Sequence, residues 1–175
     1  MRLDIELDEK MIEDARRNEV RTSFGHLGTH IDLKGKTFED TLIRVLICRI
    51  EDDTEVNDID LSSVEEGMFV IFASGHSKRY RYGSREYKDN YSTLSRELIE
   101  RLIEKKVRLI GTDGPGIRKG SEHPLIDRYL SDRDIFVVEN MYIPDTLMEG
   151  KVYEVFIRAK DKADDGMRVE INIDE

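Results

Sequence analysis

The chain has 175 residues, of which 38% are hydrophobic and 38% are charged, and its formal net charge is −10. This length suits one domain with a sizeable buried core, and we treat residues 1–175 as a single domain because no repeat or linker divides them. The negative charge argues against phosphate-rich partners, so we expect binding neither to nucleic acid nor to a membrane surface.

The chain lacks an apolar run of about 18 residues, the length that a membrane-spanning helix needs. Its N-terminus is charged from Arg2 onward, which is unlike a secretion signal. The one cysteine, Cys48, lies in an apolar stretch, so we expect a buried thiol and no internal disulfide. These features together predict a cytoplasmic protein.

The first half of the chain contains three predicted strands and one helix. Residues 2–7 alternate between apolar and charged side chains, which is typical of a half-buried strand. Residues 8–17 have helical spacing. Residues 41–50 are rich in β-branched side chains and predict a strand, which an acidic loop over residues 51–60 follows. Residues 68–73 form a short apolar run and predict a buried strand.

The second half predicts one long helix and four strands. Apolar residues from Leu94 to Ile103 repeat at helical spacing, and Ser95 is a suitable N-cap. Strands are expected at 107–110 and 135–138, with a glycine-rich turn over 111–116 after the first. Residues 152–159 and 167–173 predict a closing antiparallel pair. This order favours an α/β fold with a mixed, curved sheet flanked by helices.

Two of the four histidines fall in one short segment with an aspartate, His26-Leu-Gly-Thr-His30-Ile-Asp32. Alternation along an extended chain places His26, His30 and Asp32 on one face. Imidazole and carboxylate together are suitable ligands for Zn²⁺ or Mn²⁺. The alternative is a pair of surface histidines beside a turn. We favour a metal site.

This segment resembles the signature of the cyclase-like metal-dependent hydrolases, the family of bacterial kynurenine formamidase and isatin hydrolase. The resemblance continues in the Gly111-Thr-Asp113 turn, in His123-Pro-Leu-Ile and in Glu139-Asn140 at the end of a predicted strand. It spans about residues 23–147 in matching order. It implies the swivelling β/β/α-type fold of that family, with a barrel-like sheet.

The resemblance also implies a ligand set. His26, His30 and Asp32 would hold one ion, and Asp32 would bridge to a second ion bound by His123 and Glu139. We expect one or two divalent ions per chain, with zinc preferred to manganese. Ions so placed lower the pKa of water enough to supply hydroxide near neutral pH.

One histidine of the family pattern is missing. The family motif continues Asp-x-Pro-x-His, and that last histidine transfers protons, whereas this chain continues Asp32-Leu-Lys34-Gly-Lys36. Either Lys34 and Lys36 replace the two residues in place, or a short segment is deleted. We favour deletion. In both alignments the usual proton-transferring group is absent.

Three residues are candidates for that role. Glu139 is expected to transfer protons as well as to bind metal, as its counterpart is proposed to do in the family. His76 follows a predicted buried strand and is a second catalytic candidate. An exposed loop histidine is the alternative and the more common situation. Lys36 would require a strongly lowered pKa to act as a base.

A basic and aromatic stretch over residues 79–91 is the best place to seek substrate contacts in this acidic chain. The alternative interpretation is a polar surface loop.

We therefore expect a metal-dependent hydrolase that acts on a carbon–nitrogen bond of a small amide, N-formyl or cyclic amide substrate. A member that keeps the fold and metal but has lost or altered turnover is the alternative, and a lyase or cyclase is a third. The resemblance also implies a homodimer or homotetramer.

Overall fold

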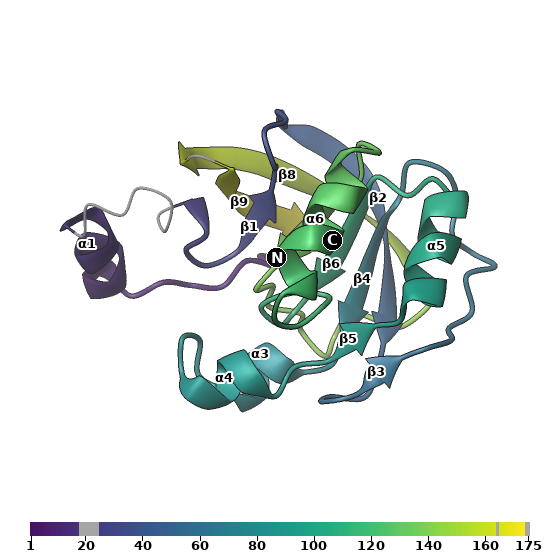
Figure 1. Ribbon diagram of the computed structural model, residues 1–175, viewed down its shortest axis with the longest axis horizontal. Coiled ribbons are helices and arrows are strands. Elements are labelled where there is room, and N and C mark those ends of the chain that lie inside the picture. The colour runs from purple at the N-terminus through teal and green to yellow at the C-terminus, as the bar shows by residue number, and fades with distance from the viewer. Residues whose placement is uncertain (18–24, 164, 174–175) are drawn as a thin grey trace.

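Seven strands close into a barrel in the computed structural model, which describes residues 1–17, 25–163 and 165–173 (Figure 1). Neighbouring strands follow the order β1-β7-β6-β4-β2-β8-β9, and β1 closes the barrel by pairing with both β7 and β9. The strands are β1 (His30–Asp32), β2 (Thr41–Arg49), β4 (Phe69–Ala73), β6 (Leu109–Thr112), β7 (Phe136–Glu139), β8 (Val152–Ala163) and β9 (Gly166–Ile173).

The barrel contains both directions of strand pairing. β2, β4, β6 and β7 run parallel, whereas β8 is antiparallel to β2 and β9, and β1 is antiparallel to both of its neighbours. The predicted α/β fold with a mixed, barrel-like sheet is therefore confirmed. The last two strands form the expected antiparallel pair.

The two faces of strand β4 pack into two separate hydrophobic clusters. All five of its residues are buried, and side chains alternate across a strand. Phe69 and Ile71 belong to the cluster that fills the barrel, whereas Val70 and Phe72 belong to the cluster that contacts the helix α5. Burying one such side chain contributes about 1.5–3 kcal/mol, which explains why this strand is apolar on both faces.

Five helices surround the barrel or extend from it in the described part of the chain: α1 (Glu9–Arg17), α3 (His76–Arg79), α4 (Arg85–Asp89), α5 (Arg96–Glu104) and α6 (Glu122–Ser131). The helix α5 begins as predicted at Ser95, whose Oγ accepts a hydrogen bond of 3.2 Å from the Leu98 amide. Figure 1 shows α1 at the left, apart from the barrel, and α6 packed on its near side.

The sequence pattern does not predict α6. Pro124 interrupts the segment, yet it stands in the first turn, where a proline removes no helical hydrogen bond. The stretch 79–91 is likewise not a simple loop, because it holds the end of α3 and all of α4. The loop expected at 51–60 contains the short strand β3 (Glu55–Val56), which pairs with β5 (Thr93–Leu94).

The predicted strand at residues 2–7 is wrong in part. Only Arg2 and Asp4 form bridges there, each an isolated pair. Two side chains accept hydrogen bonds from backbone amides that a continuous strand would pair with backbone carbonyl groups. Asp4 Oδ1 accepts a hydrogen bond from the Ile171 amide, and Thr29 Oγ1 accepts one from the Ile5 amide. The segment is nevertheless anchored to the barrel, since Leu3 is fully buried.

Among the described residues, no helix has both the length and the apolar character that crossing a membrane requires.

Candidate metal centre

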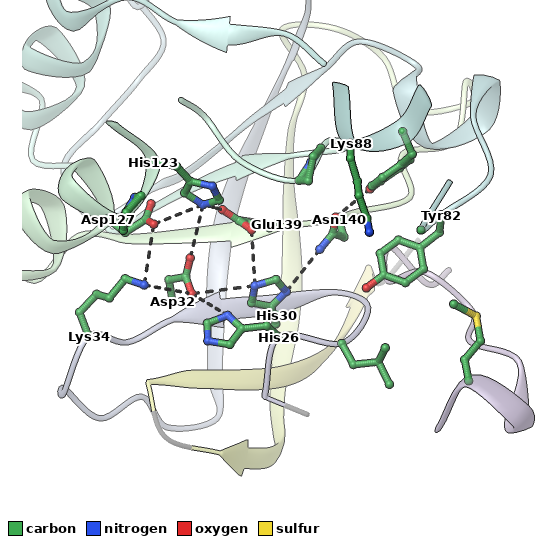
Figure 2. A pocket seen from close by; sticks show the side chains of 16 residues that line it. His26, His30, Asp32, Lys34, Tyr82, Lys88, His123, Asp127, Glu139 and Asn140 are labelled. Atoms are coloured by element: carbon green, nitrogen blue, oxygen red, sulfur yellow. Dashed lines mark hydrogen bonds and ion pairs between the residues drawn. The ribbon is translucent and has the colours of Figure 1, made fainter. Parts of the chain in front are cut away.

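Two neighbouring strands and one helix bring the predicted ligands together (Figure 2). His30 and Asp32 are two residues apart on β1, so they share a face. The antiparallel register of β1 and β7 pairs His30 directly with Glu139. His26 approaches from the segment before β1, and His123 from α6. All five predicted ligands therefore meet at one place.

The carboxylates of Asp32 and Glu139 each lie near a histidine of β1 and a histidine of α6. Asp32 Oδ1 lies 3.0 Å from His26 Nδ1 and 3.9 Å from His30 Nε2, while Oδ2 lies 3.9 Å from His123 Nε2. Glu139 Oε2 lies 3.4 Å from His30 Nε2, and Oε1 lies 2.7 Å from His123 Nε2. Both carboxylates therefore lie among the predicted histidine ligands.

A further acid, Asp127, joins the cluster and is absent from the sequence prediction. It lies four residues after His123 on α6, and its Oδ2 is 3.3 Å from His123 Nε2. Residues four apart share one face of a helix. The spacing is visible in the sequence, but it carries meaning only once residues 122–131 are known to be helical.

The ligand atoms form two groups in which all atoms lie within 4.8 Å of one another. We call His26, His30 and Asp32 the first position. We call Asp32, His123, Asp127 and Glu139 the second position.

The cluster contains buried oxygens that no described donor satisfies. Asp32 Oδ1 and both carboxylate oxygens of Asp127 are buried and accept no hydrogen bond from the described residues. Histidine nitrogens lie at ion-pair distance from them, with His26 Nδ1 3.0 Å from Asp32 Oδ1 and His123 Nε2 3.3 Å from Asp127 Oδ2. A buried polar atom without a partner is costly. The imidazole and carboxylate groups, together with these unsatisfied oxygens, therefore fit a divalent cation.

The first position holds an ion pair in the protein alone. Burial lowers the pKa of His26, but the neighbouring carboxylates of Asp32 and Asp165 outweigh it and raise that pKa to about 9. Burial raises the pKa of Asp32, yet His26, His30 and Lys34 together lower it to about 2. Asp165 reaches this group from the β8–β9 turn, with its Oδ1 3.0 Å from His26 Nε2.

The other two acids of the cluster, Asp127 and Glu139, have raised pKa values. Burial, with the charges of Glu139 and Asp32, raises the pKa of Asp127 to about 8. Burial and the charge of Asp32 raise the pKa of Glu139 well above its ordinary value. Burial lowers the pKa of His30 to about 4, which keeps this imidazole neutral and able to bind a cation.

A hydrogen bond fixes which nitrogen of His30 faces the cluster. The His30 Nδ1 atom lies 2.9 Å from the Gly28 carbonyl oxygen, which only accepts, so Nδ1 carries the proton and Nε2 is free to ligate. Asn140 donates to the same carbonyl at 3.1 Å, and its Oδ1 accepts a hydrogen bond of 2.8 Å from the Tyr87 hydroxyl.

Lys34 and Lys36, which follow Asp32 where the family motif has its proline and histidine, have different ion-pair partners. Lys34 Nζ lies 3.7 Å from Asp32 Oδ1, 3.9 Å from Asp127 Oδ2 and 3.3 Å from Asp165 Oδ2. Lys36 Nζ instead pairs with the exposed Asp134 at 3.1 Å. Lys36 therefore does not reach the cluster, whereas Lys34 does.

His76 does not lie at the cluster. Its side chain is fully buried, which rules out the exposed loop histidine, and both ring nitrogens have partners. Nδ1 lies 3.2 Å from Asp52 Oδ1, and Nε2 lies 2.8 Å from the Tyr87 carbonyl oxygen. These contacts hold the segment that follows β4. Of the three candidates for proton transfer, the structure brings only Glu139 to the other predicted ligands.

A cavity of about 470 Å³ opens onto the cluster. The 79–91 stretch lines it through Tyr82, Gly83, Tyr87 and Lys88, as one of the two interpretations expected. Apolar residues complete the wall: Met11, Leu27, Pro115 and Pro124. The cavity therefore combines an apolar wall with a polar inner end, which is typical of small-molecule sites.

The glycine-rich turn after β6 packs directly against two of the predicted ligands. A Cβ atom at Gly116 would lie 2.9 Å from His123 Cε1 and 3.2 Å from Glu139 Oε1. Asp113 of the same turn accepts hydrogen bonds from the backbone amides of Ser74, Gly75 and His76.

Solved structures share this fold. A predicted metal-dependent hydrolase from Bacillus stearothermophilus aligns with a TM-score of 0.66 at 20% identity, over 85% of this chain and 76% of that one. Isatin hydrolase A from Labrenzia aggregata aligns with a TM-score of 0.64 at 16% identity, over 86% and 74%. Isatin hydrolase A from Ralstonia solanacearum aligns with a TM-score of 0.62 at 17% identity, over 84% and 72%.

No curated protein matches the chain by sequence. The model of the Cyclase family ("Putative cyclase") does match, over residues 2–119. That span contains the first position, whereas His123, Asp127 and Glu139 lie beyond it and are placed by the fold. Because the match covers more than half of the chain, the protein belongs to the Cyclase family.

Proposed function

We propose that this protein is a metal-dependent hydrolase that cleaves a carbon–nitrogen bond of a small amide, N-formyl or cyclic amide substrate. The observation that carries the proposal is the ligand cluster at the inner end of a cavity of about 470 Å³. The similarity of the fold to isatin hydrolases supports it.

The cluster would hold one or two divalent ions, with zinc as our first choice and manganese as the second. His26, His30 and Asp32 would bind at the first position, and the remaining acids with His123 at the second. A bound ion supplies a Lewis acid that polarises a substrate carbonyl and acidifies water.

The chain's own residues would position the substrate and move the proton. Glu139 lies between His30 and His123, and we expect its carboxylate to accept a proton from water and to pass it to the leaving nitrogen. The apolar wall from Leu27, Pro115 and Pro124 would orient the substrate and exclude water.

One observation favours a second candidate, a family member with lost or altered turnover. The ammonium of Lys34 lies among the carboxylates, and no histidine follows Asp32 at the family spacing. An ammonium with carboxylate partners is a poor proton acceptor, since such partners raise the pKa of Lys34 despite burial, which lowers it.

A turnover assay separates the two candidates. The full chain, loaded with zinc or with manganese, is incubated with a panel of aryl formamides and lactams beside an Asp32→Ala variant. Hydrolysis by the loaded protein and none by the variant supports the hydrolase. If metal binding is normal and no amide is cleaved, the candidate without turnover takes its place.

A further inference from the structure

Asp127 has the properties of a metal ligand. Its side chain is 1% exposed, and neither carboxylate oxygen accepts a hydrogen bond from the described residues. Oδ2 points to His123 Nε2 at 3.3 Å, into the second position (Figure 2). A carboxylate with a purely structural role would be expected to have hydrogen-bond partners when buried this deeply.

The composition of the second position indicates the kind of ion. Three carboxylates and one imidazole provide mainly oxygen ligands, whereas the first position offers two imidazoles and one carboxylate. Oxygen-rich sites suit harder divalent ions such as Mn²⁺, and imidazole-rich sites suit Zn²⁺. Asp127 is the residue that makes the second position oxygen-rich.

Lys34 contacts the same carboxylates. Its Nζ lies 3.9 Å from Asp127 Oδ2 and 3.7 Å from Asp32 Oδ1, and its side chain is 11% exposed. The backbone of Lys34 has a φ of 47°, which a lysine rarely adopts. The tight turn over residues 33–36, closed by the Lys36 amide donating to the Leu33 carbonyl oxygen at 3.0 Å, holds it there. The ammonium is therefore directed at the cluster by the turn.

We propose that Asp127 is a fourth ligand of an ion at the second position. The Lys34 ammonium competes with that ion for Asp127 and Asp32, because both are cations that would be held by the same carboxylates and would repel each other. Occupancy of the second position is thus set by two residues with opposite effects.

Binding of Mn²⁺ tests this inference without any measurement of turnover. The purified full chain is stripped with a chelator and titrated with Mn²⁺, and free Mn²⁺ is followed by its paramagnetic resonance signal. The wild type is compared with Asp127→Asn and Lys34→Met. Asp134→Asn and Lys36→Met are matched controls, since these residues form an exposed lysine–aspartate pair nearby.

The two variants should act in opposite directions. We expect Asp127→Asn to weaken the second Mn²⁺ binding event by at least about tenfold, and Lys34→Met to strengthen it by about tenfold or more. The first event should keep wild-type affinity in Asp127→Asn, because Asp127 lies outside the first position. Both control variants should keep wild-type affinity for both events within about threefold, the scatter expected for changes outside the ligand shell.

Two results would overturn the inference. One is Mn²⁺ binding by Asp127→Asn with the same affinities as the wild type. The other is a second binding event that is weaker in Lys34→Met than in the wild type, or that is not observed in this variant. Should Asp127→Asn fail to fold, as judged by circular dichroism, the Lys34→Met result decides alone. A protein that binds two ions in this pattern but cleaves no amide would contradict the proposed hydrolase and leave this inference intact.

Discussion

Gly116 brings the backbone of the glycine-rich turn within contact distance of His123 and Glu139. We predict that Gly116→Ala weakens Mn²⁺ or Zn²⁺ binding by about tenfold, because the new methyl group displaces both side chains. Calorimetric titration measures the effect. Gly120→Ala is the control, since no atom lies within 4 Å of a Cβ there. Equal binding by both variants would show that the turn does not position the ligands.

The titrating groups of the cluster predict how stability depends on pH in the chelated protein. The pKa of His26 is raised from 6.5 to about 9, so its stabilising ion pair is fully present below pH 6.5 and is lost as pH rises through 9. The pKa of Asp127 is raised from 3.8 to about 8, so its neutral form favours folding, and this contribution is lost as pH rises toward 8.

Both contributions have the same sign, so the melting temperature of the chelated protein should fall between pH 6.5 and pH 9. Thermal melts followed by circular dichroism test this. Asp127→Asn should flatten the lower part of the curve, because the amide does not titrate. A melting temperature that rises over this range would contradict the prediction.

At the scale of elements, the pairing of β1 with β7 creates the centre of the site. A shift of one residue in this register would move His30 away from Glu139 and turn Asp32 to the other face. The short strand β1 is held on both sides, by β7 and by β9, and the Leu33 amide adds a hydrogen bond of 2.6 Å to the Asp165 carbonyl oxygen. The ligands on β1 are therefore placed by strand pairing.

The cap of α5 is a second prediction at this scale. Ser95→Ala removes the hydrogen bond to the Leu98 amide and should lower the free energy of unfolding by about 1 kcal/mol. Ser121→Ala is a matched control, because Ser121 occupies the N-cap of α6 without a side-chain capping bond. Urea denaturation should show no comparable loss for Ser121→Ala. Equal losses would mean that the Ser95 bond contributes nothing specific.

At the scale of the whole molecule, the ligands come from residues 26 to 139 and meet only when the barrel is closed. An ion that binds the folded chain and not the unfolded chain must raise its apparent stability. At an ion concentration of about one hundred times the Kd, we expect a gain of about 2.7 kcal/mol, which corresponds to about 5–10 °C in Tm for a chain of this size.

Differential scanning calorimetry of the chelated protein, with and without zinc or manganese, measures this gain. Asp32→Ala should abolish it, since Asp32 belongs to both positions. A chain that carries no metal when purified and gains no thermal stability from either ion would contradict the metal centre itself.

The sequence alone predicted the strands with continuous apolar residues, the closing antiparallel pair, the cap at Ser95 and the fold class, but its alternating residues 2–7 form no continuous strand. It also indicated His26, His30 and Asp32, because their spacing alone places them on one face. These features depend on local pattern, so neighbouring residues suffice to predict them. The resemblance to a family then extended the ligand set to His123 and Glu139.

The sequence does not show which polar residues share the site, and the three-dimensional fold is needed to see it. Asp127 enters it because α6 forms despite Pro124, and Lys34 enters it because a tight turn directs its ammonium inward. His76 is instead held elsewhere by Asp52 and the Tyr87 carbonyl oxygen. Such placements depend on contacts between residues far apart in the chain, and a one-dimensional pattern does not contain them.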